Sequence, residues 1–244
     1  MEDNRHQAYD RGSTIFSPDG RLYQVEYARQ AVKRGTTSVG LRTESGIVLA
    51  ASRRVRSPLV VLESIEKTHY VDDHIAVASA GHVADGRHLI DVCRRDAQEN
   101  RFEFDRPISV AELTDLLSEY IQERTQTGGY RPFGAALLVG GVRDGESRLF
   151  SIDPSGTTYE WTATGIGNGA EAARESLAQR HEESMSLDEG VDLALETLAP
   201  LTETVRPGVF DVSVVDASTA SVELLSTETV DAHLSELDVS VDDE

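Results

Sequence analysis

Residues 9–35 read YDRGSTIFSPDGRLYQVEYARQAVKRG, and this stretch decides the fold. Pro18 fixes its own φ and Gly20 tolerates a positive φ, so residues 17–20 are expected to form a turn. A helix is expected to follow, because Leu22, Val25 and Val32 recur at helical spacing and form one apolar face. Tyr23 and Tyr27 lie one turn apart on a second face. The helix therefore has two surfaces for contacts.

The end of this helix carries its own signals. Lys33 and Arg34 occupy the last turn, where the helix dipole favours cations. Gly35 is expected to end the helix in the left-handed cap conformation. The residues alone are compatible with an ordinary surface helix packed through one stripe.

The stretch resembles, almost residue for residue, the N-terminal segment of the α subunits of the proteasome core particle. The matching positions there are Tyr9, Asp10, Arg11, the turn from Phe16 to Gly20, Leu22, Val25, Glu26, Tyr27 and Ala28. The resemblance continues at Gly35, Thr36, Thr37, Arg53, Val55, Ile65, Glu66, Lys67, Arg131, Pro132, Asp153 and Pro154. It therefore spans most of the chain.

Length and composition indicate a single globular domain. The chain has 244 residues, of which 39% are hydrophobic, and it shows no Gly/Ser linker and no internal repeat. We expect a flexible segment at 1–12, one domain at 13–230 and an acidic tail at 231–244. No signal peptide or stretch long enough to cross a membrane is found, which predicts a cytoplasmic protein. The single cysteine, Cys93, shares a helical pattern with Leu89 and Ala97 and is expected to be buried.

The charge is strongly negative, with 43 acidic against 23 basic residues and a formal net charge of −20. Nucleic acid is not expected as a partner, because phosphate binding depends on clustered Lys and Arg. Only Lys33 and Lys67 are lysines. An acidic, lysine-poor surface resembles proteins of salt-loving archaea, in which concentrated salt screens the self-repulsion; ordinary acidic solubility does not explain the missing lysines.

Hydrophobic periodicity predicts hairpins and pairs of helices. Strands are expected at 37–42, 46–52, 68–71, 74–80, 133–140, 148–152, 157–160, 162–165, 210–215 and 221–225. Helices are expected at 83–100, 110–125, 170–181 and 187–198. Blocks of strands that alternate with pairs of helices indicate an α+β protein. The resemblance implies the four-layer αββα sandwich of the N-terminal-nucleophile hydrolases.

The main alternative is a β-type subunit, a threonine peptidase with Thr36 as nucleophile after removal of a propeptide. The run from Gly35 to Gly40, GTTSVG, imitates the cleavage site of such subunits. In an ungapped count from Thr36, however, the position of the acid that these peptidases need falls on Ser52, and that of their lysine falls on Thr68, beside Lys67. The sequence therefore favours Thr36 as a buried strand residue and a chain without catalytic residues.

Two further patterns suggest ligands. The run 165–170, GIGNGA, satisfies a dinucleotide-binding fingerprint, but two helix patterns follow it where a βαβ unit is required. It is interpreted as a tight connection between a strand and a helix. The cluster of His69, Asp72, Asp73 and His74 fits no common metal spacing, and we expect these side chains to be solvated. No metal and no cofactor are expected.

The resemblance implies a gating role. α subunits of this family form a heptameric ring at each end of the β rings, and residues before about Gly12 cover the axial pore through which unfolded proteins enter. The positions matching the gate are Tyr9, Asp10, Arg11, Pro18 and Tyr27. The positions matching the pocket for the C-terminus of a regulatory AAA ATPase are Gly20, Arg21, Leu22, Glu26, Gly35 and Lys67. Lys67 has a second interpretation, as half of a surface ion pair with Glu63 or Glu66.

Overall fold

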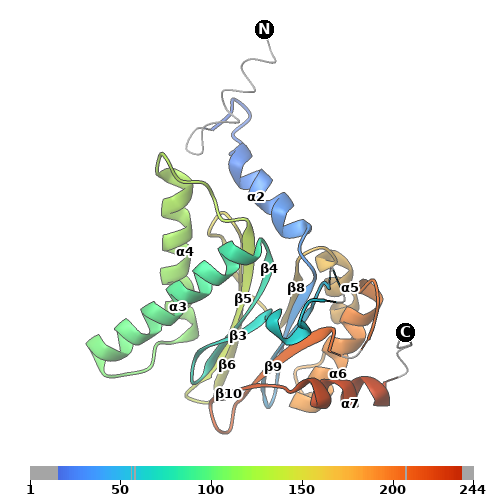
Figure 1. The fold of residues 1–244 in the computed structure, drawn as a ribbon. Helices are drawn as coiled ribbons and strands as arrows, with labels where there is room; N and C mark the ends of the chain where they lie inside the picture. The colour runs from blue at the N-terminus through green and yellow to red at the C-terminus, as the bar shows by residue number, and fades with distance from the viewer. Residues whose placement is uncertain (1–15, 56, 58, 207, 238–244) are drawn as a thin grey trace.

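A turn and one helix open the chain, as the sequence predicts. The structure, a computed structural model, describes residues 16–55, 57, 59–206 and 208–237. The Gly20 N–H donates to the Ser17 carbonyl at 2.9 Å, and Gly20 has a φ of +73°. Helix α2 (Tyr23–Lys33) then buries Val25, Ala28 and Val32. It projects from one end of the molecule, where its base contacts β4 and β5 (Figure 1).

Two antiparallel five-stranded sheets form the centre of the described chain. The first sheet has the order β10-β9-β2-β1-β8, with β10 Ser221–Leu224, β9 Phe210–Asp216, β2 Gly46–Ser52, β1 Ser38–Thr43 and β8 Ala163–Ile166. The second has the order β3-β4-β5-β6-β7, with β3 Thr68–Asp72, β4 Ile75–Gly81, β5 Ala135–Arg143, β6 Glu146–Ile152 and β7 Thr158–Glu160.

Helices cover the outer face of each sheet. α3 (Val83–Phe104) and α4 (Val110–Gln126) pack on the second sheet, and α5 (Ala170–Arg180), α6 (Leu187–Leu198) and α7 (Thr227–Glu236) pack on the first. Short 3-10 turns lie at Leu62–Ser64 and Ala199–Leu201. The order of layers is helix, sheet, sheet, helix (Figure 1), which confirms the expected αββα sandwich.

Successive side chains of a strand point to opposite faces of its sheet, and in both sheets each face is covered, one by the other sheet and one by helices. In β2, Ile47 and Leu49 face the space between the sheets, whereas Val48 and Ala50 face α5 and α6. β4 repeats the pattern in the second sheet, with Val77 turned toward α3 and α4. These strands therefore appear in the sequence as continuous apolar runs.

The structure extends one expected helix and adds another that was not expected. α3 continues to Phe104 and ends where Asp105 takes the left-handed conformation, just before Arg106 and Pro107. α7 crosses the boundary expected at residue 231, because Val230 and Leu234, one turn apart, are buried against the first sheet and α6. The folded domain thus includes residues of the segment assigned to the tail.

Gly35 differs from its expected role. It does not adopt a positive φ, and α2 ends at Arg34 in the right-handed region. A Cβ on Gly35 would lie 2.2 Å from the Gly81 nitrogen, so the glycine is required for close backbone approach. The absence of a side chain lets the base of α2 touch the end of β4.

Candidate functional site

Four of the predicted docking residues gather at the free end of α2. Gly20, Arg21 and Leu22 precede the helix, and Glu26 lies in its first turn. The Arg21 guanidinium donates to both carboxylate oxygens of Glu26, at 2.6 and 2.7 Å. This bidentate pair ties the turn to the helix. The pair is exposed, so its charge is screened by solvent.

Two of the predicted gate residues, Pro18 and Tyr27, lie at the same end of the described chain. Tyr27 projects from α2 with half its surface exposed, and Pro18 is exposed in the preceding turn. Tyr9, Asp10 and Arg11 lie outside the described residues.

The remaining two docking residues, Gly35 and Lys67, lie at the base of α2. Gly35 contacts Gly81, and Gly81 lines a small cavity together with Lys67, Glu66, His69 and others. β3 begins directly after Lys67, and the Lys67 carbonyl accepts a hydrogen bond from the Ser79 N–H of β4. The sheet therefore fixes the lysine backbone beside the end of α2.

Lys67 is buried without an ion pair. It is 7% exposed, and its ammonium makes no hydrogen bond or ion pair with the described residues. Burial lowers the pKa of Lys67 to about 8, and the nearby Asp211 opposes that shift. The alternative of a surface pair with Glu66 is wrong, because Glu66 lies near His69 instead; the Glu63 side chain is outside the part of the chain that the structure describes.

The two halves of the predicted docking set are far apart in one chain. From Glu26 to Gly35, α2 rises about 13 Å. The group at its free end therefore lines no common cavity with Lys67.

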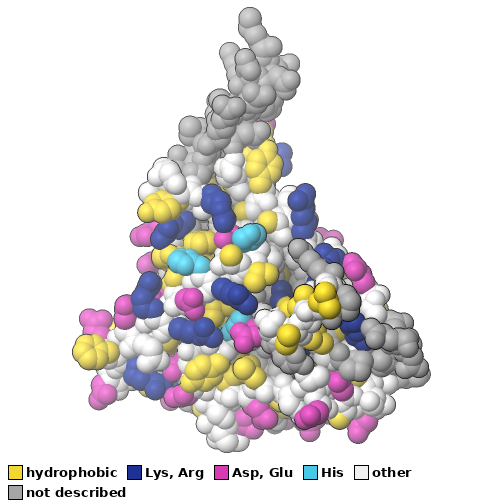
Figure 2. Space-filling model, in the orientation of Figure 1, with side chains coloured by type: hydrophobic (Ala, Val, Ile, Leu, Met, Phe, Trp, Pro, Cys, Tyr) yellow, Lys and Arg dark blue, Asp and Glu magenta, His cyan; other side chains and the backbone are white. Residues whose placement is uncertain are grey.

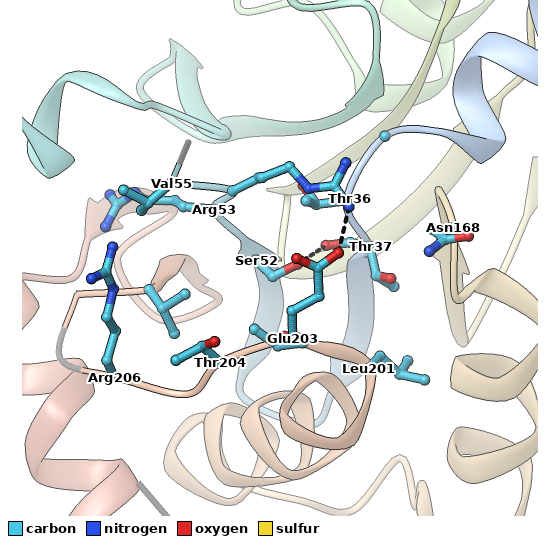
Figure 3. Close-up of a pocket in the computed structure, with 14 residues that line it drawn as sticks. Thr36, Thr37, Ser52, Arg53, Val55, Asn168, Leu201, Glu203, Thr204 and Arg206 are labelled. Atoms are coloured by element: carbon cyan, nitrogen blue, oxygen red, sulfur yellow. Dashed lines mark hydrogen bonds and ion pairs between the residues drawn. The ribbon is translucent and has the colours of Figure 1, made fainter. Parts of the chain in front are cut away.

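A separate polar cavity of about 240 Å³ contains Thr36 (Figure 3). Thr36 is half-buried and precedes β1, so the expectation that it is a buried strand residue is wrong. Its neighbour Thr37 is buried, but it also lies before the strand. The Ser52 hydroxyl lies in the position expected for an acid and donates to the Thr37 carbonyl at 3.4 Å. Arg54 and Glu203 pair with each other at 2.8 Å beside it.

The one carboxylate among the described residues that line the Thr36 cavity is Glu203, and it is held by Arg54. Lys67 lines the other cavity and contributes nothing here. Arg53 points its guanidinium at the Asp211 carboxylate, at 3.1 Å, and at the carbonyls of Ile65, Gly208 and Phe210. Arginine stays protonated in proteins and does not serve as a base. With Glu203 paired to Arg54 and no lysine among the described lining residues, the cavity offers no free amine or carboxylate as the base that a threonine nucleophile needs.

The glycine-rich run 165–170 connects β8 to α5, as expected. Gly167 has a φ of +95°. The Asn168 N–H donates to the Gly35 carbonyl at 2.9 Å, and the Gly169 N–H donates to the Thr37 hydroxyl at 3.1 Å. These amides, which would hold a phosphate in a dinucleotide site, are used within the chain.

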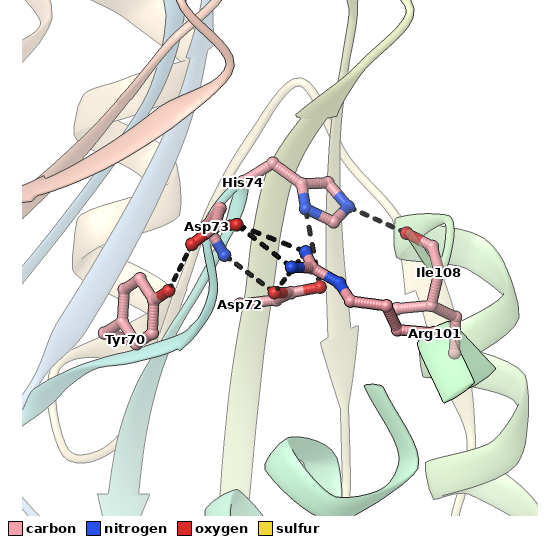
Figure 4. A network of polar contacts seen from close by, with 6 residues as sticks. All are labelled: Tyr70, Asp72, Asp73, His74, Arg101 and Ile108. Carbon is pink, nitrogen blue, oxygen red and sulfur yellow. Dashed lines mark hydrogen bonds and ion pairs between the residues drawn. The ribbon is translucent and has the colours of Figure 1, made fainter. Parts of the chain in front are cut away.

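His69, Asp72 and His74 are buried, which corrects the expectation that they are solvated, whereas Asp73 is exposed as expected. Asp72 is 1% exposed and accepts from Arg101 at 2.9 Å (Figure 4). The His74 Nε2 lies 2.7 Å from the Ile108 carbonyl, so this nitrogen carries the proton and donates. Asp73 bonds Tyr70 and Arg101 at the surface. The cluster joins the β3–β4 turn to α3.

Two family comparisons decide what this arrangement belongs to. The profile of the family described as "Proteasome subunit" matches residues 32–215, and the N-terminal signature of A-type proteasome subunits matches residues 9–31. The chain belongs to the proteasome subunit family. It is of the α type, the non-catalytic class of the threonine protease complex, and the β-type alternative is wrong.

Relatives in halophilic archaea resemble this α-type chain over nearly its whole length. Proteasome α subunit 2 of Haloarcula marismortui is 54% identical over 240 residues, covering 98% of each chain. The proteasome α subunit of Natronomonas pharaonis is 52% identical, covering 97% of this chain and 93% of its own. Proteasome α subunit 1 of Haloferax volcanii is 53% identical, covering 94% and 92%. Subunits of this family assemble into rings with other proteasome subunits.

The structure also contains basic residues near Lys67 that sequence reasoning missed. Arg34, Arg87 and His82 surround the base of α2. In the sequence, each resembles an ordinary surface position on or beside a helix. Among the described helices, none is long and apolar enough to cross a membrane.

Proposed function

We propose that this chain forms the heptameric α ring of a proteasome core particle, in which it gates the axial pore and docks the C-termini of a regulatory AAA ATPase. In this role it admits unfolded proteins to a chamber formed by β subunits, in the cytoplasm. The observation that carries the proposal is the buried Lys67 ammonium, which has no ion pair with the described residues.

A buried, unpaired ammonium is costly for a protein to keep. Its partner in the working assembly is then an anion from outside the chain. The cavity beside Lys67 is small, but it adjoins the larger groove between α2 and α3, with which it shares Gly81, His82 and Val83, and the anion can approach from that groove. A terminal carboxylate is small and carries a single charge, which suits the compact ammonium of lysine.

The division of the docking set supports a pocket between subunits. Gly35 and Lys67 form one wall, and Gly20, Arg21, Leu22 and Glu26 of the neighbouring copy form the other. One ring then contains a pocket at each contact between subunits. A docked carboxylate touches two subunits together and changes their relative position.

The direction of α2 supports the assignment of the gate to the segment that precedes this helix. The helix projects from the body with its N-terminus at the free end (Figure 1), and residues 1–12 precede it in the sequence. We assign the covering of the pore to that segment, with Tyr9, Asp10, Arg11, Pro18 and Tyr27 holding its arrangement between neighbouring subunits.

The proposal is tested by Lys67→Ala in particles reconstituted with their β partner. ATPase-stimulated degradation of an unfolded protein is expected to be lost, because the incoming carboxylate is left unpaired at a cost of about 2–5 kcal/mol. Hydrolysis of short peptides is expected to stay unchanged. Lys33→Ala is the matched control, because Lys33 is an exposed lysine at the end of α2. Normal ATPase stimulation of the Lys67→Ala particle would refute the docking role.

A further inference from the structure

Most cations of this acidic chain are paired, and the exceptions are informative. Arginines such as Arg21, Arg29 and Arg148 each hold a carboxylate. Among the described residues, four lysine and arginine side chains form no hydrogen bond or ion pair: Lys33, Arg34, Lys67 and Arg87. The chain has 43 acidic and 23 basic residues, so a basic side chain easily finds a carboxylate partner. A basic side chain that has none is therefore unusual in this protein.

Three of these four side chains line two adjoining hollows, a groove and a small cavity, which are together called the depression here. Arg34 and Arg87 lie in a groove of about 1100 Å³ between α2 and the first two turns of α3. Arg87 also lines the small cavity of Lys67, and the two hollows share Gly81, His82 and Val83. Figure 2 shows basic and histidine side chains gathered on the face that carries α2 and α3. Lys33 is outside this lining.

Carboxylates in the same lining do not neutralise these cations. Asp91 pairs with Arg94 at 3.2 Å. Glu66 is exposed and lies 3.7 Å from His69. His82 and His88 add polar groups to the groove wall, and His82 lies 3.5 Å from Asp85. The depression therefore keeps an excess of positive charge on a molecule whose net charge is −20.

We propose that this depression binds the acidic end of a partner peptide: the terminal carboxylate enters at Lys67, and side-chain carboxylates of the preceding residues contact Arg87 and Arg34. This rests on the proposed function, in which Lys67 receives a terminal carboxylate, and it adds the chemistry of the residues before the terminus. A guanidinium holds a carboxylate through two parallel hydrogen bonds, which favours Asp or Glu at those positions.

The length of the groove determines how far from the C-terminus of the partner peptide its acidic residues lie. From Val83 to Asp91, α3 rises about 12 Å. An extended peptide covers that distance in about four residues. The acidic residues of the partner then lie within roughly five residues of its C-terminus.

The experiment compares three fluorescently labelled hexapeptides on assembled particles, at a salt concentration that keeps the ring intact. The first has Glu at the upstream positions and a free C-terminus, the second replaces Glu by Gln, and the third amidates the C-terminus of the first. We expect the Gln peptide to bind on the order of tenfold more weakly than the Glu peptide.

Substitutions at Arg87 and Arg34 test whether these two residues cause the tighter binding of the Glu peptide. Arg87→Gln and Arg34→Gln are each expected to remove most of the advantage of the Glu peptide and to leave binding of the Gln peptide unchanged. Lys33→Gln is the matched control, an unpaired cation outside the depression, and it is expected to preserve that advantage.

The outcomes separate the two proposals. Equal binding of Glu and Gln peptides, with amidation still harmful, would overturn the acidic-peptide inference and leave Lys67 docking intact. Binding of the amidated peptide as tight as that of the free-carboxylate peptide would refute Lys67 docking itself. If Arg87→Gln and Arg34→Gln both stop ring formation, as measured by particle size, the depression is a contact between copies of this chain and the inference is wrong.

Discussion

Asp211 accepts the backbone N–H of Lys67 at 2.6 Å and leaves the ammonium of the same residue unpaired. The Asp211 carboxylate instead pairs with Arg53 at 3.1 Å. The aspartate therefore fixes where Lys67 lies without neutralising it. The backbone of Lys67 is thus held in place while its ammonium stays without an ion pair, which is the arrangement expected of a residue that binds a ligand.

Docking is expected to weaken above about pH 8. Lys67 has a pKa lowered to about 8 by burial, so its ammonium is present below that pH and is lost as the pH rises through it. A bound carboxylate raises this pKa, so affinity falls by up to tenfold per pH unit between the free and bound values. Peptide binding measured from pH 7 to 9.5 checks this.

Lys67→Arg is the control for this pH dependence, because arginine stays charged throughout the range. His69 beside the cavity does not interfere, since burial lowers its pKa further below the range. An affinity for wild type that stays flat across the range would contradict the role of the Lys67 charge.

Thr36→Ala is expected to leave the peptidase rate of a reconstituted particle unchanged. The cavity of Thr36 contains Ser52 where an acid is needed, and Lys67 lies in another cavity. Steady-state hydrolysis of a short fluorogenic peptide checks this, with particle size measured in parallel. A fall to background in intact particles would show that the threonine is a nucleophile.

Gly35→Ala is expected to destabilise the fold by about 1–3 kcal/mol. The new methyl group would lie 2.2 Å from the Gly81 nitrogen, which belongs to backbone and cannot rotate away. Gly128→Ala is the matched control, since a Cβ there meets nothing within 4 Å. The midpoints of denaturant unfolding are measured for Gly35→Ala and Gly128→Ala. Equal midpoints would show that α2 moves freely away from β4.

Deletion of residues 2–12 is expected to raise hydrolysis of unfolded protein far more than that of very short peptides, because only the larger substrate needs a wide pore. The deletion also removes the need for the ATPase. A variant that combines the deletion with Lys67→Ala is then expected to degrade unfolded protein without ATPase. If the double variant behaves like Lys67→Ala alone, the gate is not in this segment.

Ring assembly is expected to require salt. Subunits with a net charge of −20 bring like charges together at each contact. The Debye length falls from ~10 Å at 0.1 M salt to ~3 Å at 1 M, so concentrated salt screens that repulsion. Size-exclusion chromatography across a salt series checks this. A ring that survives unchanged at low ionic strength would contradict adaptation to high salt.

The sequence predicted the strands and most helices because their apolar periodicity is strong. β2 and α6 begin and end at their expected residues. α7 was missed because Thr, Glu, Asp and Ser dominate it, and only the spacing of Val230 and Leu234 signals a buried face.

The site was predicted less completely than the fold. Resemblance supplied Gly35 and Lys67, but no local pattern reveals that Lys67 is buried, because the residues that cover it come from β4 and the start of α3. Asp72 and His74 were misjudged for the same reason. Their partners, Arg101 and Ile108, lie about thirty residues away in the chain.

The attachment of α2 determines how force passes through the folded chain. The helix is pinned at its base by the Gly35–Gly81 contact and braced midway, where Arg29 donates to Asp153 at 2.9 Å and to Ser155 at 3.2 Å. Because α2 is held to the domain at two points, it tilts only together with the domain. Under the proposed gating role, α2 therefore changes its tilt relative to the pore only when the whole subunit rotates.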